Sequence, residues 1–214
     1  MPKIDFAHVT NWVFDLDHTL YPATGSLFRQ IEVRMSQWMV DELGIDHARA
    51  EYLRKHYWAT YGTTLAGLMR EHGVDPGPYL THVHDIDFTV LAPDPALRAG
   101  LENLPGRRIV YTNGNANYAR KVIDARGLSG VFAEVYGIEN ANFLPKPERA
   151  AFETVFAKDG VQPTQAAMFE DDPRNLKAPH ELGMKTVHVA ETGAQGEHIH
   201  HHTNDLANFL TRLV

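Results

Sequence analysis

Residues 12–21 read WVFDLDHTLY, an apolar run followed by two aspartates one residue apart. The run has the β-branched and aromatic character of a buried strand. Such a run normally continues into a core or ends at a turn residue, so the carboxylates of Asp15 and Asp17 need another explanation. In an open parallel sheet, ligands bind beyond the carboxyl ends of the strands. The stretch therefore predicts a site at the end of the first strand.

The composition excludes several classes of protein. The chain has 214 residues, enough for one domain with an insertion. It contains no cysteine, which excludes disulfides, thiolate metal sites and cysteine nucleophiles. The residues are 43% hydrophobic and 22% charged, as in ordinary globular proteins. No stretch approaches the ~18 consecutive apolar residues of a membrane span, so we expect no membrane partner.

The charge of the chain narrows the choice of partner. A formal net charge of −7 argues against a nucleic-acid polymer, because Lys and Arg side chains drive binding to its phosphates. The N-terminal residues MPKIDFAHVTN lack the basic and apolar regions of a secretory signal. We expect a cytoplasmic protein that binds a small molecule. The sequence leaves its oligomeric state open.

The remaining strands alternate with helices. Five apolar runs predict strands, at residues 12–16, 108–112, 134–138, 166–170 and 185–189. From the second run onward, a segment with helical periodicity separates each run from the next. Strands that alternate with helices form a parallel sheet covered on both faces. We therefore predict a doubly wound, Rossmann-like α/β fold with five strands.

The first connection does not follow this alternation. Between Leu16 and Arg108 the sequence contains no convincing strand, and its apolar residues recur at helical spacing. The spacing predicts helices at about 27–43, 46–61, 64–72 and 76–84. Prolines near residues 22 and 93–95 mark the boundaries of this insertion. We predict a core of residues 1–21 and 91–214, and an all-helical cap of residues 22–90, named the cap segment below.

Polar residues end three of the predicted strands. Asp15 and Asp17 follow the first, Thr112 and Asn113 follow the second, and the acidic run 170–172 follows the fourth. Two unit charges 4 Å apart repel by roughly 4 kcal/mol at an effective dielectric near 20, so a cation must lie among these acids. An oxygen-only cluster suits a hard cation, and Mg²⁺ is the common one at phosphoryl sites.

Four motifs in order resemble those of the haloacid dehalogenase-like superfamily. They are DLDHT at 15–19, YTNGN at 111–115, FLPKP at 143–147 and FEDDPRN at 169–175. With the cap segment they account for nearly the whole chain. The resemblance implies a hydrolase with a Rossmann-like core, a helical cap after the first strand and a Mg²⁺ cofactor.

The resemblance also assigns roles to residues. It implies that Asp15 is the nucleophile that forms an aspartyl-phosphate, and that Asp17 is the general acid and base. Thr112, Asn113 and Gly114 would bind the phosphoryl oxygens, and Lys146 would neutralise the charge on the nucleophile and on the phosphoryl group.

The implied metal ligands are the Asp15 carboxylate, the Asp17 backbone carbonyl and Asp171. Glu170 or Asp172 would add a ligand through water or orient Lys146. Without the motifs, Lys146 between two prolines would be interpreted as a solvated turn lysine.

Several activities occur in this superfamily. Its dehalogenases lack the second aspartate, because a halide leaving group needs no proton, so Asp17 favours phosphoryl transfer. Its phosphonate hydrolases use a cap lysine, whereas Lys55, the only lysine of the cap segment, is expected to face solvent. A sugar-phosphate phosphatase and a β-phosphoglucomutase-like mutase remain alternatives. A more distant alternative is a phosphate-binding module without catalysis.

Two details are similar to the pyrimidine 5′-nucleotidase branch of the superfamily. The first motif carries His18 followed by LYP, and residues 61–68 read YGTTLAGL. This similarity implies a pyrimidine nucleoside 5′-monophosphate as substrate. The expected contacts to its leaving group come from two stretches of the chain, namely Tyr21, Phe28, Tyr61, Thr63 and Thr64.

A histidine-rich stretch lies near the C-terminus, at His198 to His202. Its spacing does not match an ordered zinc site, so we interpret these residues as solvated loop histidines. The amphipathic sequence NDLANFLTRLV follows and predicts a last helix.

Overall fold

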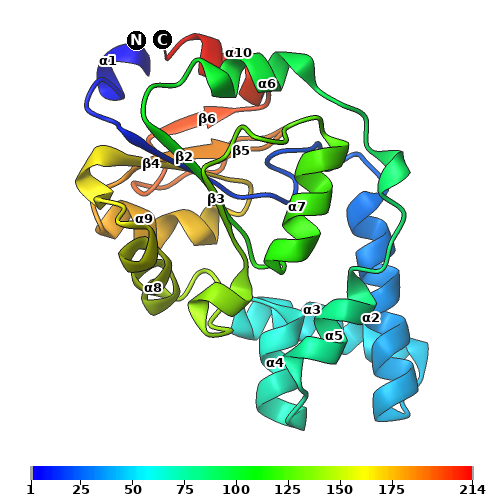
Figure 1. Ribbon diagram of the computed structural model, residues 1–214. Coiled ribbons are helices and arrows are strands. Elements are labelled where there is room, and N and C mark those ends of the chain that lie inside the picture. The colour runs from blue at the N-terminus through cyan, green and yellow to red at the C-terminus, as the bar shows by residue number, and fades with distance from the viewer. Residues whose placement is uncertain (1, 214) are drawn as a thin grey trace.

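The computed structural model describes residues 2–213 and contains one parallel sheet of six strands (Figure 1). The strands lie in the order β3-β2-β1-β4-β5-β6, and every neighbouring pair is parallel. The order reverses direction next to β1, which makes this the point where such sheets bind ligands. The strands are β1 (Asn11–Phe14), β2 (Arg107–Tyr111), β3 (Glu134–Tyr136), β4 (Ala166–Glu170), β5 (Lys185–Val189) and β6 (His201–Thr203).

Both faces of the sheet are covered, because side chains of β1 alternate between two apolar cores. Trp12 and Phe14 belong to one core and Val13 to the other, and all three are buried. The first core includes residues of the helices α6 (Pro95–Glu102), α7 (Ala116–Ala125) and α10 (Leu206–Thr211). The second includes residues of α8 (Arg149–Asp159) and α9 (Lys177–Glu181). The prediction of a doubly wound parallel sheet is confirmed, with one strand more than expected.

The cap segment is helical and lies at the side of the sheet where α7 begins (Figure 1). Its helices are α2 (Leu27–Leu43), α3 (His47–Tyr61), α4 (Thr64–His72) and α5 (Pro76–Val83). Asp46, Thr63 and Asp75 cap the last three helices through side-chain oxygens that accept backbone N–H groups. Within residues 2–213, no helix has both the length and the apolar character needed to cross a bilayer. The domain boundaries after residues 21 and 90 stay a prediction.

The sixth strand corrects the interpretation of the histidine-rich stretch. β6 pairs with β5 in parallel register, with Val187 opposite His201. The neighbouring Thr186 hydroxyl donates to the His198 carbonyl at 2.7 Å and lies 2.7 Å from Nδ1 of His200. These histidines are therefore held at the sheet edge. Sequence patterning missed the strand because a three-residue edge strand built largely of histidine shows little apolar alternation.

Arg126 holds the two segments, called the crossings below, in which the chain passes between the core and the cap segment. Its guanidinium donates to the Leu20 carbonyl at 3.1 Å, just before the cap segment, and to the Ala92 carbonyl just after it. It also pairs with the Asp94 carboxylate at 2.7 Å. Because Arg126 is buried and ends α7, it fixes both crossings to the core.

Arg126→Met should destabilise the protein, because it leaves two carbonyls and the Asp94 carboxylate without their donor. We expect the free energy of unfolding to fall by about 2 kcal/mol or more, since Asp94 is only partly exposed. Urea denaturation measures this change. Arg120→Met, which removes an exposed arginine of α7 that makes only a 3.6 Å contact with Glu134, is the control and should cost less than about 1 kcal/mol. Equal losses in the two variants would contradict the role given to Arg126.

Candidate functional site

The sheet brings the predicted strand ends together beside the reversal point. Asp15 follows β1, and its backbone N–H donates to the Phe169 carbonyl of β4 at 2.9 Å. This hydrogen bond places Asp15 beside Glu170, the last residue of β4. Thr112 follows β2 on the other side of β1 and is fully buried. Three strand ends thus supply one site, as the sequence predicts.

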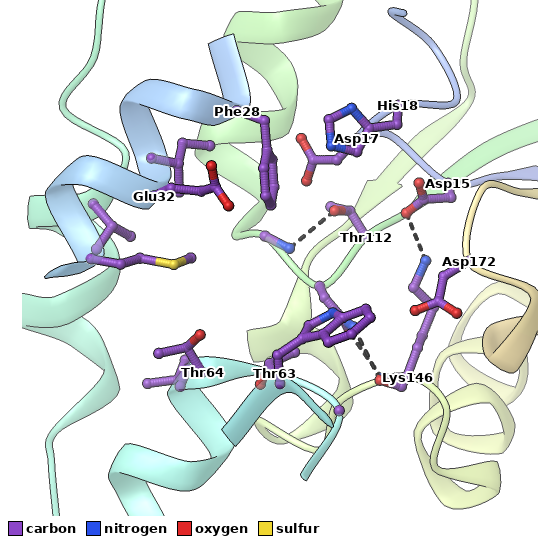
Figure 2. A pocket seen from close by; sticks show the side chains of 18 of the residues that line it. Asp15, Asp17, His18, Phe28, Glu32, Thr63, Thr64, Thr112, Lys146 and Asp172 are labelled. Atoms are coloured by element: carbon purple, nitrogen blue, oxygen red, sulfur yellow. Dashed lines mark hydrogen bonds and ion pairs between the residues drawn. The ribbon is translucent and has the colours of Figure 1, made fainter. Parts of the chain in front are cut away.

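Lys146 ties these strand ends together (Figure 2). Its Nζ donates to Oδ1 of Asp15 at 2.7 Å and to Oε2 of Glu170 at 2.6 Å. The third donor reaches the Tyr111 carbonyl at 3.1 Å, at the end of β2. The lysine is only 1% exposed, so all of its donors serve the site. Lys146 is therefore a buried cation between two carboxylates and not a solvated turn residue.

The ionisation of this cluster follows from its burial. Burial alone would lower the pKa of Lys146, but Asp15 and Glu170 raise it above its ordinary value. Burial and the Asp15 charge raise the pKa of Glu170, against the opposing effect of Lys146. Burial and Glu170 likewise raise the pKa of Asp171 well above its usual range. Lys146 alone therefore does not offset the burial and mutual repulsion of these carboxylates, which resist holding their full negative charge without a further cation.

The same acids fit a hard divalent cation. Asp15, Glu170 and Asp171 each offer a carboxylate oxygen, and these oxygens lie within 4.8 Å of one another. An all-oxygen donor set with excess negative charge suits Mg²⁺. Asp15 and Glu170 each use one carboxylate oxygen to hold Lys146, whereas the Asp171 carboxylate does not contact it. The role of the Asp17 backbone carbonyl stays a prediction.

Asp17 lies apart from the metal-fitting acids and is held by two tyrosines. Its Oδ1 accepts hydrogen bonds from Tyr21 at 2.6 Å and from Tyr118 at 2.5 Å. Burial, followed by the Asp15 charge, raises the pKa of Asp17, and the hydrogen bonds from Tyr118 and Tyr21 oppose this rise. Burial and Asp17 raise the pKa of both tyrosines, so they remain donors. Asp17 is thus oriented and inclined to hold a proton.

The backbone at His18 adopts a conformation that is uncommon for residues other than glycine. His18 has φ 63°, in the left-handed region that glycine adopts without steric cost. Its ring packs against Phe28 of α2, with the ring centroids 4.8 Å apart. The turn directs Asp15 and Asp17 to different sides of the site, and the His18 ring connects this turn to the cap segment.

The second motif has a more structural role than expected. The Asn113 side chain donates to the Lys146 carbonyl at 3.1 Å and accepts from the Lys146 backbone N–H at 2.8 Å. It therefore anchors the lysine loop, and its side chain is occupied. The Gly114 backbone N–H donates to the Thr112 hydroxyl at 3.0 Å. The Thr112 hydroxyl keeps its own hydrogen to donate to a ligand.

Asp172 is engaged by Arg174 and not by Lys146. The Arg174 guanidinium binds both carboxylate oxygens of Asp172, with the shortest contact at 2.6 Å. The carbon of the guanidinium lies 3.8 Å from the centre of the Trp58 ring in α3. Of the two acids considered for orienting Lys146, Glu170 does so. Asp172 instead connects the fourth motif to the cap segment.

The site opens into a cavity of about 600 Å³ between the strand ends and the cap segment. Of the expected leaving-group contacts, Phe28, Thr63 and Thr64 line it (Figure 2). Tyr21 does not stack on a ligand, because it is 2% exposed and binds Asp17. Tyr61 points to another part of the surface, where its hydroxyl donates to Glu71 at 2.5 Å.

Sequence reasoning missed several residues of the site. Tyr118 lies in the first turn of the helix after the second motif. Because that turn faces the strand ends, the position of Tyr118 in the sequence could have indicated that it belongs to the site. The residues of the cap wall gave no such signal, since helical stripes of apolar residues are typical of any packed helix. The missed wall residues include Glu32, Arg54, Trp58, Tyr79 and His84.

Comparison with known proteins gives relatives of low sequence identity. The chain is 27% identical to Phosphate metabolism protein 8 of Saccharomyces cerevisiae over 83% of its own length, and spans 61% of that relative. It is 26% identical to Enolase-phosphatase E1 of Streptomyces avermitilis over 80% of its length and 70% of the relative's.

Solved structures share the fold at low identity. The magnesium-bound putative HAD-hydrolase YfnB of Bacillus subtilis has a TM-score of 0.60 at 15% identity, over 96% of this chain and 98% of that one. The 2-haloacid dehalogenase of Pseudomonas syringae pv. tomato has a TM-score of 0.59 at 18% identity, over 96% and 100%. The model of the haloacid dehalogenase-like hydrolase family matches residues 12–189, and the chain belongs to this family.

Proposed function

We propose that the protein is a Mg²⁺-dependent phosphatase that hydrolyses small phosphate monoesters, with pyrimidine nucleoside 5′-monophosphates as substrates. One observation carries the proposal. Asp17, whose pKa is raised by burial and whose carboxylate is oriented by Tyr21 and Tyr118, lies two residues from Asp15, which is bound to Lys146. A nucleophile beside a separate proton donor is what cleavage of a phosphate ester requires.

The reaction follows from these positions. An Asp15 oxygen attacks phosphorus, the bond from phosphorus to the ester oxygen breaks, and Asp17 gives that oxygen a proton. Asp17 then takes a proton from a water molecule, which attacks phosphorus. The bond between phosphorus and the Asp15 oxygen breaks, and phosphate is released. Lys146 and the Thr112 hydroxyl stabilise negative charge on the phosphoryl oxygens. A Mg²⁺ ion bound by Asp15 and Asp171 would supply further neutralisation of that charge.

The choice of phosphatase over dehalogenase rests on Asp17. A halide leaves as a stable anion and needs no proton, so a dehalogenase gains nothing from an acid at this position. The alkoxide of a nucleoside is a poor leaving group and does need one. The similarity to solved dehalogenases concerns the fold and does not weigh against this argument.

The cavity wall favours a leaving group with an apolar ring. The wall contributed by the cap segment is largely apolar, and a sugar phosphate rich in hydroxyls would leave much of it without a matching surface. The apolar side chains of the wall are Phe28, Ile31, Met35, Trp58, Leu65, Leu80 and Val83.

Asp15→Asn should abolish phosphate release while the fold remains intact. The amide is a poor nucleophile, and Lys146 keeps its ion pair with Glu170. We expect phosphatase activity to fall by at least about 1,000-fold with p-nitrophenyl phosphate and with uridine 5′-monophosphate, since covalent catalysis is lost. Circular dichroism checks the fold. Near wild-type turnover by the purified variant would rule the mechanism out.

Asp17→Asn should affect substrates according to their leaving groups. Turnover of nucleoside monophosphates should fall about 100-fold or more, because their alkoxides need a proton. Turnover of p-nitrophenyl phosphate should fall much less, because p-nitrophenolate departs without full protonation. Steady-state kinetics on both substrates measure the ratio. Equal losses would count against Asp17 as the proton donor.

Lys146→Met should destabilise the metal-free protein, because it leaves Asp15 and Glu170 buried without their cation. We expect the free energy of unfolding in EDTA to fall by about 3–5 kcal/mol. Urea denaturation measures it, with the exposed Lys177→Met as a control that should stay close to wild type. An unchanged stability of Lys146→Met would show that the buried ion pairs do not hold the strand ends together.

A further inference from the structure

The cap segment carries a charged cluster at the wall of the cavity. Arg54 of α3 donates through Nη1 to Oε1 of Glu32 in α2 at 2.8 Å and through Nη2 to Oε2 of Glu51 at 3.1 Å. The Arg54 side chain is 12% exposed and that of Glu32 is 24% exposed. Glu32 and Arg54 line the cavity. A pair of opposite charges therefore lies in the wall beside its apolar side chains, next to a third charged residue, Lys55.

The hydrogen-bonding capacity of this pair is not used up by the protein. Oε1 of Glu32 accepts from Arg54, while Oε2 receives only a long contact of 3.3 Å from the exposed Arg29. Within residues 2–213, Nε of Arg54 and the hydroxyl of Tyr79, which also lines the cavity, have no hydrogen-bond partner. Buried donors without acceptors are unfavourable. The wall thus offers an acceptor next to donors that lack a partner.

The position of this cluster suits the far end of a substrate. In Figure 2 the Phe28 ring lies between Glu32 and Asp17, so a leaving group that extends from the reacting phosphate passes Phe28 before it reaches Glu32. A planar ring can stack on Phe28 in this space. Its distal edge then meets the carboxylate of Glu32 and the guanidinium of Arg54.

An edge that matches this wall carries a donor next to an acceptor. Cytosine presents its amino group beside N3, and uracil presents N3–H beside O4. The Glu32 carboxylate accepts the N–H in either case, and a guanidinium donor serves the neighbouring acceptor.

We propose that Glu32 and Arg54 form the subsite that recognises the leaving group. They bind the donor and acceptor edge of a planar nitrogen heterocycle, such as a pyrimidine base. This inference rests on the proposed phosphatase function and identifies the part of the protein that selects the substrate. Remote contacts of this kind raise the specificity for one phosphate ester above that for others.

Glu51 provides a matched control. It binds the same guanidinium as Glu32, and its second oxygen accepts from the Ser36 hydroxyl. Unlike Glu32, it does not line the cavity. If the ion pair between Glu32 and Arg54 only held α2 against α3, removing the carboxylate of Glu32 or that of Glu51 would have a similar effect on substrate selectivity. If Glu32 contacts the substrate, only its substitution changes selectivity.

The test compares Glu32→Gln and Glu51→Gln with the wild type on cytidine 5′-monophosphate, uridine 5′-monophosphate and p-nitrophenyl phosphate. The readout is kcat/KM for each nucleotide divided by kcat/KM for p-nitrophenyl phosphate. In Glu32→Gln the ratio should fall about 10- to 100-fold, the effect of losing a hydrogen bond to a charged group. In Glu51→Gln the ratio should stay at the wild-type value.

Two outcomes with the variants would overturn the subsite. One is an unchanged ratio in Glu32→Gln, and the other is an equal fall in both variants. A wild-type enzyme that hydrolyses p-nitrophenyl phosphate but prefers neither nucleotide would also overturn it, while the phosphatase proposal would stand. A wild-type enzyme that hydrolyses none of the three esters would overturn both.

Discussion

The ion pairs of Lys146 with Asp15 and Glu170 are the interaction on which the rest of the site depends. One buried ammonium group joins the ends of β1, β2 and β4, because its three donors reach a residue at or directly after each strand. Without this cation, the sheet would place like charges together in a region of low dielectric. The same contact holds the Asp15 carboxylate in place. In the mechanism that we propose, it positions the nucleophile before a substrate arrives.

The cap segment covers the side of the site that the strand ends leave exposed to water. A site at the edge of a sheet is exposed to water on one side, and the helices after the first motif cover this side. Asp172 and Arg174 connect the fourth motif to Trp58, while Arg126 fixes both crossings of the chain. Under the proposed function, the core carries out the chemistry and the wall contributed by α2 and α3 selects the leaving group.

Much of the core could be predicted from the sequence, because strand ends and motif order constrain it strongly. Asp15, Thr112 and Lys146 lie where the pattern places them. The directions of Tyr21 and Tyr61 could not be predicted, since an aromatic residue next to a site can face the ligand, the protein or solvent. Strand β6 was missed because an edge strand needs little apolar alternation. The pair of Glu32 and Arg54 joins two helices, and such a contact leaves no local pattern.

The central claim is that Asp15 carries the phosphoryl group during turnover. Mass spectrometry of protein quenched in acid while it hydrolyses p-nitrophenyl phosphate with Mg²⁺ tests this claim most directly. We expect a fraction of the protein to gain the mass of one HPO₃ unit, located on the peptide that contains Asp15 and released by hydroxylamine. A phosphoryl group on another residue, or rapid turnover with no adduct at any quench time, would contradict it.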